Sequence, residues 1–191
     1  MTVQRKSAAG GVILLLAAIL ILTGCMRVAM LRFYRAAYPV DYQDTVVACA
    51  LERELPPELV FAVIYSESGF NHEAVSYVEA RGLMQITEDT FEWARWRMGD
   101  DEAIDFNQMF VPETNIRYGT AILALLLDEF AGEREALSAY HAGWGSVKGW
   151  LQKEEYSNNG STLDYIPFGD TRAYVAKVLQ TKEIYRRLYT F

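Results

Sequence analysis

The feature that most constrains this chain is an uninterrupted apolar run, Leu59 to Tyr65, that leads into Ser66-Glu67-Ser68-Gly69. A helix that is apolar on every side belongs inside a domain, and Gly69 suits the left-handed residue that follows a helix. We therefore predict that Glu67 lies in the last turn of a buried helix. Burial and the unpaired carbonyls of a helix C-terminus both raise the pKa of a carboxyl group, which makes Glu67 a candidate general acid. The alternative is a surface glutamate paired with an arginine, the commoner role of a lone glutamate.

Four more motifs follow Glu67-Ser68-Gly69-Phe70 along the chain. In order they are Gly82-Leu83-Met84-Gln85-Ile86, Asn115-Ile116-x-x-Gly119, Ala139-Tyr140-His141-Ala142-Gly143 and Ile166-Pro167-Phe168-Gly169-Asp170-Thr171-Arg172-x-Tyr174-Val175-x-x-Val178. One such motif arises often by chance, but five in this order are specific. Together they resemble the lytic transglycosylases related to soluble lytic transglycosylase, which have a goose-type-lysozyme-like catalytic domain. The resemblance spans about residues 55–188 and implies an all-α, lysozyme-like fold.

The resemblance also implies a reaction that needs only one carboxylate. Ordinary glycosidases use two, one to protonate the leaving oxygen and one to attack or to activate water. In the family, a single glutamate, here Glu67, protonates the β-1,4 bond between N-acetylmuramic acid and N-acetylglucosamine and then takes the proton of the muramic 6-hydroxyl. That hydroxyl closes on the anomeric carbon and leaves a 1,6-anhydromuramic end. The expected enzyme cleaves peptidoglycan by a lyase-type reaction and needs no cofactor.

Further residues match family positions that line the cleft or contact the glycan: Ser68, Met84, Gln85, Tyr140, His141 and Asp170. Structural alternatives stay open for several of them. Ser68 could cap the end of its helix, Met84 could belong to the core, and Asp170 suits the N-cap of the last helix. Tyr140 suits the stacking of a sugar on its ring.

Three positions depart from the family pattern. His141 replaces the usual asparagine and brings a titrating group into the cleft. Asp170 replaces the usual glutamate and is one methylene shorter. Ile122 replaces a tyrosine often found in the long helix and removes a polar contact. None of these changes touches Glu67, so the expected chemistry stays the same.

The N-terminus predicts export. Arg5 and Lys6 precede an apolar run over residues 8–26, as in a secretory signal or a membrane anchor. The sequence Leu22-Thr23-Gly24-Cys25 resembles a bacterial lipobox, which places a lipid on Cys25 after cleavage. The alternative is an uncleaved span, since about 19 mostly apolar residues can just cross a bilayer. Either form predicts an extracytoplasmic enzyme held at the membrane, with residues 1–26 as signal or anchor, 27–40 as a juxtamembrane arm and 41–191 as the lysozyme-like domain.

The charge of the exported part argues against one class of partner. From Met26 onward, 16 basic residues face 25 acidic ones, a net charge near −9. Nucleic-acid binding calls for a basic stripe, so we expect no nucleic-acid partner. The expected partners are peptidoglycan glycan strands and the membrane. His72 and His141 lie far apart and lack metal-ligand spacing, so we expect no metal site.

Helix start and stop signals divide the rest of the chain. They predict helices over residues 42–54, 57–67, 87–99, 112–132, 133–141, 146–153 and 170–188, with loops over 71–80, 100–111 and 156–167. No repeat or low-complexity linker interrupts this pattern. We therefore expect one α-helical domain on a tether.

Two other functions are alternatives to the lytic transglycosylase. A non-catalytic peptidoglycan-binding module uses the same groove without turnover, but such a module is expected to lose Glu67. A water-using lysozyme needs a second carboxylate opposite Glu67. Asp170, Glu73 and Glu79 are the candidates near the motifs.

Overall fold

The computed structural model describes residues 3–191, with side chains from residue 10 onward. The side chains of Arg5 and Lys6, the predicted n-region, therefore lie outside the described residues. The chain divides into two compact units, the first ending at Pro39 and the second formed by Val40–Phe191.

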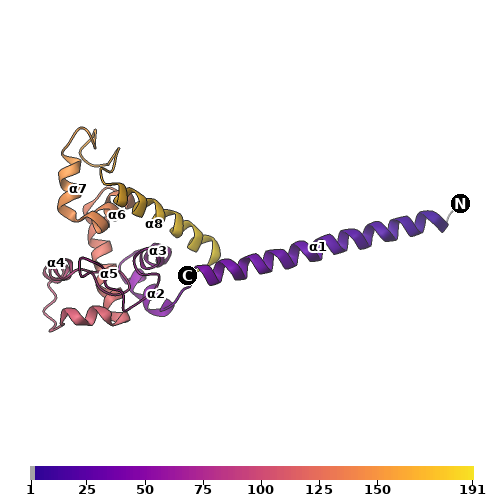
Figure 1. The fold of residues 1–191 in the computed structure, drawn as a ribbon, viewed down its shortest axis with the longest axis horizontal. Coiled ribbons are helices and arrows are strands. Elements are labelled where there is room, and N and C mark those ends of the chain that lie inside the picture. The colour runs from indigo at the N-terminus through magenta and orange to yellow at the C-terminus, as the bar shows by residue number, and fades with distance from the viewer. Residues whose placement is uncertain (1–2) are drawn as a thin grey trace. The chain divides into compact units, whose positions relative to one another are not determined.

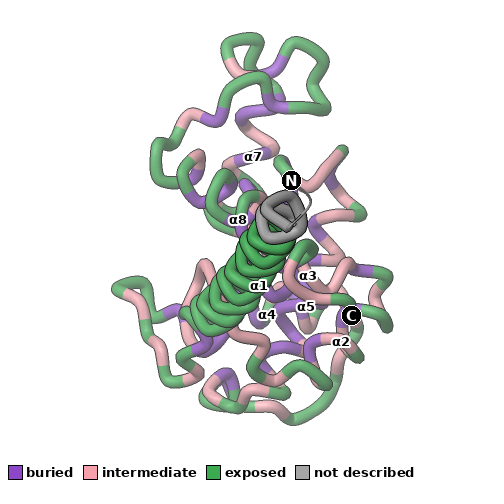
Figure 2. The backbone as a smooth tube through the Cα atoms, turned by 90° about the vertical axis from the view of Figure 1, so that its right-hand side faces the viewer, coloured by how far each residue is buried: buried purple, intermediate pink, exposed green. Residues whose placement is uncertain are grey.

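The first unit is essentially one helix, α1 (Val3–Ala37), which is exposed along residues 10–37 (Figure 2). Its stretch Gly10–Ala37 is long and apolar enough to cross a membrane, as judged by length and composition. The 28 residues of that stretch extend roughly 42 Å at about 1.5 Å per residue, which exceeds the ~30 Å of a bilayer's hydrocarbon core. The helix continues through residues 27–37 without a break, so most of the expected juxtamembrane arm is helical.

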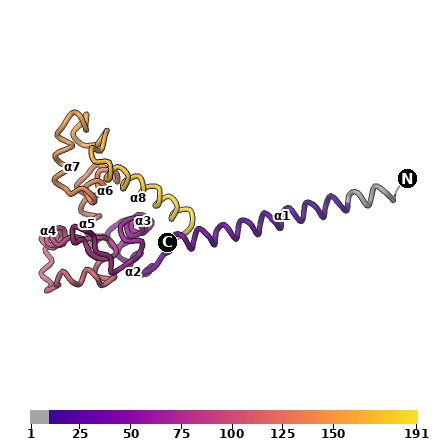
Figure 3. Tube along the Cα trace, viewed as in Figure 1, coloured from indigo at the N-terminus to yellow at the C-terminus, as the bar shows by residue number. Residues whose placement is uncertain are grey.

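The second unit is built from helices alone (Figures 1 and 3). They are α2 (Gln43–Glu52), α3 (Pro57–Glu67), α4 (Glu88–Met98), the short 3₁₀ helix η1 (Phe106–Phe110), α5 (Pro112–Glu129), α6 (Glu133–Ala142), α7 (Trp144–Leu151) and α8 (Gly169–Leu188). No strand forms within residues 3–191, where extended pairing is limited to isolated bridges from Arg81 to Val75 and to Ile86. The predicted all-α fold is confirmed.

Helix α3 forms the centre of this unit. It begins with Pro57, whose missing N–H costs nothing in a first helical turn. Every side chain from Leu59 to Ile64 is buried, and α3 packs mainly against α8. The Phe61 ring stacks on Tyr185 of α8 at 5.4 Å between ring centroids. Burial of this all-round apolar helix fixes the position of its last residue, Glu67.

The predicted helix boundaries hold closely at α4. The side chain of Thr87 accepts a hydrogen bond from the backbone N–H of Thr90, and Gly99 adopts the left-handed conformation at φ 63° that ends the helix. Other boundaries differ from expectation: α5 ends at Glu129, before the predicted 132, and α7 spans Trp144–Leu151, two residues before the predicted 146–153. Phe106–Phe110 forms η1 inside a predicted loop. Helix α8 begins at Gly169 after Phe168, so Asp170 lies inside the first turn and is not the N-cap.

Candidate active site

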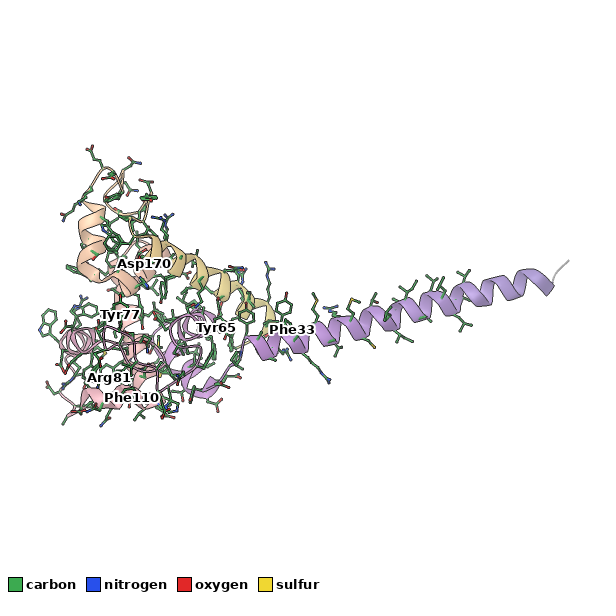
Figure 4. All side chains as sticks on the ribbon, in the orientation of Figure 1. Phe33, Tyr65, Tyr77, Arg81, Phe110 and Asp170 are labelled. Atoms are coloured by element: carbon green, nitrogen blue, oxygen red, sulfur yellow. The ribbon has the colours of Figure 1, made fainter. Side chains whose placement is uncertain are left out.

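A cleft of about 520 Å³ opens beside the C-terminal end of α3. Glu67 lines it, together with the 76–80 loop, Gln85 to Thr87, the end of α6 and the start of α8. Figure 4 labels Tyr77 and Asp170, which line it from the 76–80 loop and from the start of α8. Segments far apart in the sequence therefore meet around one carboxyl group.

Glu67 is the last residue of α3 and is only partly exposed. Burial raises the pKa of its carboxyl to about 7, while the Tyr174 hydroxyl and the charge of Lys177 act in the opposite direction. Loss of water disfavours the ionised form, and nearby donors and cations favour it. The balance leaves Glu67 able both to give and to take a proton near neutral pH.

Tyr174, a residue of the last motif, lies on α8 beside Glu67. The sequence did not predict this position, because helical spacing placed Tyr174 only on the apolar face of the last helix. Its hydroxyl is buried and meets no acceptor at standard hydrogen-bond geometry within the described residues. It nevertheless lies close enough to Glu67 to lower the pKa of that carboxyl. Burial and the Glu67 charge hold the pKa of Tyr174 well above its usual range, so the phenol keeps its proton. Its place in the last motif, four residues after Asp170, is the signal that could have revealed it.

Tyr140 lies on α6 and is also close enough to Glu67 to be affected by its charge. Its hydroxyl donates a hydrogen bond to the backbone oxygen of Met84 at 2.8 Å. Burial and the charge of Glu67 hold the pKa of Tyr140 well above its usual range. Its ring also lines the cleft. Tyr140 therefore ties α6 to the 82–86 turn and presents its ring to the cavity.

The side chain of Asn115 holds the 82–86 turn in place. Asn115 is buried in α5 and is the first residue of the motif Asn115-Ile116-x-x-Gly119. Asn115 Oδ1 accepts from Met84 N at 2.8 Å, and Nδ2 donates to Arg81 O at 3.0 Å and Met109 O at 2.8 Å. Gly82, at φ 74°, lies so close that a Cβ atom there would stand 2.1 Å from Met109 O. The turn thus needs a glycine and an asparagine at these two positions.

Three of the sequence-predicted substrate-binding residues belong to this turn and its support. Ser68 Oγ donates to Leu83 O at 2.8 Å, which links the end of α3 to the turn. Met84 is fully buried and packs where a side chain at Gly119 would stand. Gln85 lines the cleft, but its Nε2 donates to Ala74 O and Gly82 O at 3.1 and 2.9 Å. Ser68 and Met84 do not line the cleft, and their contact with a glycan stays a prediction.

His141 and Asp170 line the cleft from α6 and α8. His141 Nδ1 lies 3.1 Å from Thr171 Oγ1, and its ring packs on Tyr174 at 4.5 Å between centroids. Burial lowers the pKa of His141, and the nearby Asp170 opposes that shift. Asp170 is exposed, and its Oδ1 accepts from Thr171 N at 2.8 Å.

The carboxylates that line the cleft within the described part of the chain are Glu67 and Asp170. Glu73 and Glu79, the other candidates for a second carboxylate, are exposed and lie outside the lining. Among residues with described positions, no group of three or more His, Cys, Asp or Glu side chains could hold a metal ion. Proton transfer by Glu67 is the chemistry that this arrangement offers.

Residues 45–162 match a family model described as the transglycosylase SLT domain. The soluble lytic murein transglycosylase of Escherichia coli K12 is 33% identical over 156 residues, which cover 78% of this chain and 23% of that protein. The membrane-bound lytic murein transglycosylase C of Sodalis glossinidius is 30% identical over 150 residues, which cover 68% of this chain and 42% of that protein.

Solved structures give the same result. The 70-kDa soluble lytic transglycosylase of Escherichia coli superposes with a TM-score of 0.71 at 30% identity, covering 81% of this chain and 25% of that one. An inactive mutant of the lytic transglycosylase Slt of Pseudomonas aeruginosa gives a TM-score of 0.69 at 32% identity over the same shares. The chain spans about a quarter of the length of these soluble relatives.

Proposed function

Because this chain belongs to the family of transglycosylase SLT domains, we propose that it is a peptidoglycan lytic transglycosylase. It cleaves the β-1,4 bond between N-acetylmuramic acid and N-acetylglucosamine and leaves a 1,6-anhydromuramic end. The observation that carries this proposal is the state of Glu67, a carboxyl with a pKa of about 7 at the wall of the cleft. Relatives that bear the name of lytic murein transglycosylases support the substrate class.

In the first step, the protonated Glu67 carboxyl gives its proton to the glycosidic oxygen as the bond to the muramic anomeric carbon breaks. The acetamido group of the substrate stabilises the positive charge that develops there, which is a known exception to the two-carboxylate rule. In the second step, the Glu67 carboxylate takes the proton of the muramic 6-hydroxyl as that oxygen bonds to the anomeric carbon. Glu67 regains its proton and no water is consumed.

Between the two steps Glu67 carries a full negative charge, which a buried site disfavours. Two neighbours stabilise this state. The Tyr174 phenol, which keeps its proton, is a hydrogen-bond donor beside the carboxylate, and the Lys177 ammonium adds a favourable charge. Catalytic hydrogen bonds are often long in the absence of substrate and shorten in the complex. We therefore assign Tyr174 the role of holding the carboxylate between its acid and base steps.

The test uses the full chain in detergent micelles, incubated with purified sacculi beside its Glu67→Gln variant. Products about 18 mass units lighter than hydrolysis products correspond to the loss of one water on closure by the 6-hydroxyl. We expect them from the wild type, and roughly 10²–10⁴-fold less from Glu67→Gln, since a positioned acid or base contributes that factor to the rate. Normal turnover by the variant overturns the mechanism.

Other products favour the alternatives. Hydrated reducing ends indicate a water-using lysozyme, and Asp170 is then the carboxylate to change, because it lines the cleft with Glu67. An Asp170→Asn variant that loses those ends assigns the water-activating role to it. Binding to sacculi without any product indicates a non-catalytic module.

We propose that α1 holds the enzyme at the outer side of the cell membrane, in keeping with its length and the membrane-bound relatives. Two forms of this tether differ in a measurable way. An uncleaved span keeps residues 1–24, whereas lipidation removes them and adds lipid to Cys25. The intact mass of the membrane form distinguishes them, and Cys25→Ser changes that mass beyond the substitution itself only in the lipidated form.

A further inference from the structure

A second cavity, of about 210 Å³, adjoins the cleft. The two cavities share the lining residues Thr90, Ile122, Tyr140 and Gly143. We name the second cavity the annex, and its remaining lining residues are Asp89, Trp93, Leu126, Ala139 and Trp144. Since Tyr140 and Ile122 line both cavities, the annex lies directly beside the cavity that Glu67 lines.

The annex walls are mainly apolar and aromatic. Leu126 and Ile122 are buried, Trp93 is partly buried, and Trp144 is 44% exposed. Asp89, an exposed residue in the first turn of α4, is the one charged side chain of the lining within the described residues. A ligand that fits this lining combines an aliphatic portion with a positive charge.

The two indole rings are fixed in place by one carboxylate. Arg97 lies over the Trp93 ring at 5.4 Å and Lys148 over the Trp144 ring at 5.5 Å. Glu129 pairs with both cations, at 4.0 Å from Arg97 and in a close contact with Lys148. This carboxylate of α5 thereby joins α4 to α7, the helices that carry the two rings. It also neutralises part of the positive charge near them, which leaves Asp89 as the charge of the annex itself.

We propose that the annex binds the peptide branch of a peptidoglycan strand and that Asp89 pairs with the free amine of its diamino acid. The inference rests on the proposed function. A muramic residue in the cleft carries its peptide as a side branch, and the annex lies directly beside the cleft, within reach of that branch. The aliphatic stem of a diamino acid packs against indole rings, and its ammonium forms a charge-assisted hydrogen bond with a carboxylate.

The test removes the charge from each partner in turn. Sacculi whose free amines have been acetylated are compared with untreated sacculi, with the wild-type chain, Asp89→Asn and the matched control Glu88→Gln, all in detergent micelles. Glu88 neighbours Asp89 in the first turn of α4 but lines neither cavity. Initial rates of release and sedimentation with sacculi are both measured, the latter in the Glu67→Gln background, so that binding is read even without turnover.

We expect acetylation to weaken binding and kcat/KM of the wild type by roughly three- to tenfold, since Asp89 is exposed and solvent weakens an ion pair at the surface. Asp89→Asn loses that discrimination, and Glu88→Gln retains it. Discrimination that persists in Asp89→Asn overturns the proposal. The proposal is also overturned if Asp89→Asn weakens binding equally to glycan strands with and without their peptides, because the annex then binds a sugar. Absence of cleavage by the wild type contradicts the proposed function. The proposal for the annex is still tested in that case, because sedimentation with acetylated and untreated sacculi measures binding without turnover.

Discussion

The floor and the rim of the cleft are built in opposite ways. We call floor the 82–86 turn with its support, which is Gln85 in the lining and Ser68 and Asn115 outside it. The side chains of these three residues are bonded to backbone groups of the protein itself. On the rim, Tyr77 is 98% exposed and Phe168 is 51% exposed. The floor therefore holds Glu67 and the turn around it in fixed positions. The rim has side chains that a glycan could cover.

This difference changes how a motif is interpreted. A motif residue can be needed because it touches the substrate or because it shapes the backbone that does. Asn115 and Gly82 belong to the second kind, since a buried amide and a positive φ angle hold the 82–86 turn.

Asn115→Leu should have the largest effect, on stability. The change leaves Met84 N and Met109 O buried without the partner that Asn115 supplies, while Arg81 O keeps its bond from Ile86 N. We expect the free energy of unfolding to fall by about 4 kcal/mol, because each buried unpaired group costs roughly 1–3 kcal/mol. Denaturant unfolding followed by tryptophan fluorescence measures it.

The matched control for Asn115→Leu is Asn107→Ala. Asn107 also bonds the Arg81 residue, through a 2.9 Å hydrogen bond from its guanidinium, but the bond is exposed. We expect a loss of less than about 0.5 kcal/mol there, as for most surface changes. Equal losses in the two variants would mean that the buried amide does not hold the floor.

Glu67→Gln should stabilise the fold at high pH. The folded state keeps the Glu67 proton up to a pKa of about 7, whereas the ordinary value is 4.5. Because the folded chain binds more protons than the unfolded one between these values, wild-type stability falls as pH rises from about 4.5 to about 7.

We expect Glu67→Gln to exceed the wild type by roughly 1–3 kcal/mol at pH 8, a range lowered from the full shift because the carboxyl is partly exposed. The two should converge near pH 4. Unfolding in denaturant at both pH values measures the gap, and Glu73→Gln, an exposed carboxyl outside the cleft lining, serves as the control. A gap that does not change with pH would contradict the raised pKa.

The parts of this molecule that were predictable from sequence have local signals. The all-round apolar run gave α3 and the position of Glu67 at its end, and Thr87 and Gly99 gave the limits of α4. Glu67, Gln85, Tyr140, His141 and Asp170 do line one cleft. Their clustering was predictable because the order of the motifs indicated a family whose tertiary arrangement is known. The spacing of the residues alone does not contain that arrangement.

The missed parts depend on contacts between distant elements. The spacing of Tyr174 along its helix is the same whether its hydroxyl lies beside Glu67 or its ring only packs in the core. The annex needs α4, α5, α6 and α7 to meet, and no local pattern joins Trp93 to Trp144. The short helix η1 follows a run of polar residues that gives no periodic signal, and it is capped by Asp105, whose side chain accepts from Asn107 N.

His141→Asn should alter the acid side of the pH–activity profile. Burial lowers the pKa of His141, and Asp170 opposes this, so the ring is neutral at pH 7 and becomes cationic only in acid. A cation that forms beside Tyr174 disfavours protonated Glu67. We expect wild-type activity to fall by roughly two- to fivefold below the pKa of His141, a loss that a single charge in a partly solvated cleft can produce.

The His141→Asn variant should lack this acid-side loss, because it has no titrating ring. Asp170→Asn gives a test of sign, since removal of the opposing carboxylate should lower the pKa of His141 further and move the loss to lower pH. Initial rates on sacculi between pH 4.5 and 8 measure both variants. An unchanged acid limb in His141→Asn would assign that limb to another group.

Tyr77→Ala should give the smallest effect on the fold and a selective effect on binding. Tyr77 lies in a turn where Ser76 Oγ accepts from Ala80 N at 3.1 Å and Glu79 has a φ of 59°. This turn presents a ring that is 98% exposed at the lining of the cleft. Its removal should change the free energy of unfolding by less than about 0.5 kcal/mol, because the ring packs on almost nothing.

The same change should weaken sedimentation with sacculi by roughly two- to tenfold, since an aromatic contact contributes about 0.5–1.5 kcal/mol. Trp96→Ala is the control, because Trp96 is 77% exposed on α4 and lines neither the cleft nor the annex. If both variants bind as the wild type does, exposed rings on the rim do not hold the glycan. The floor residues would then have to bind the glycan. To do so, their side chains would exchange hydrogen bonds within the protein for hydrogen bonds to the sugar.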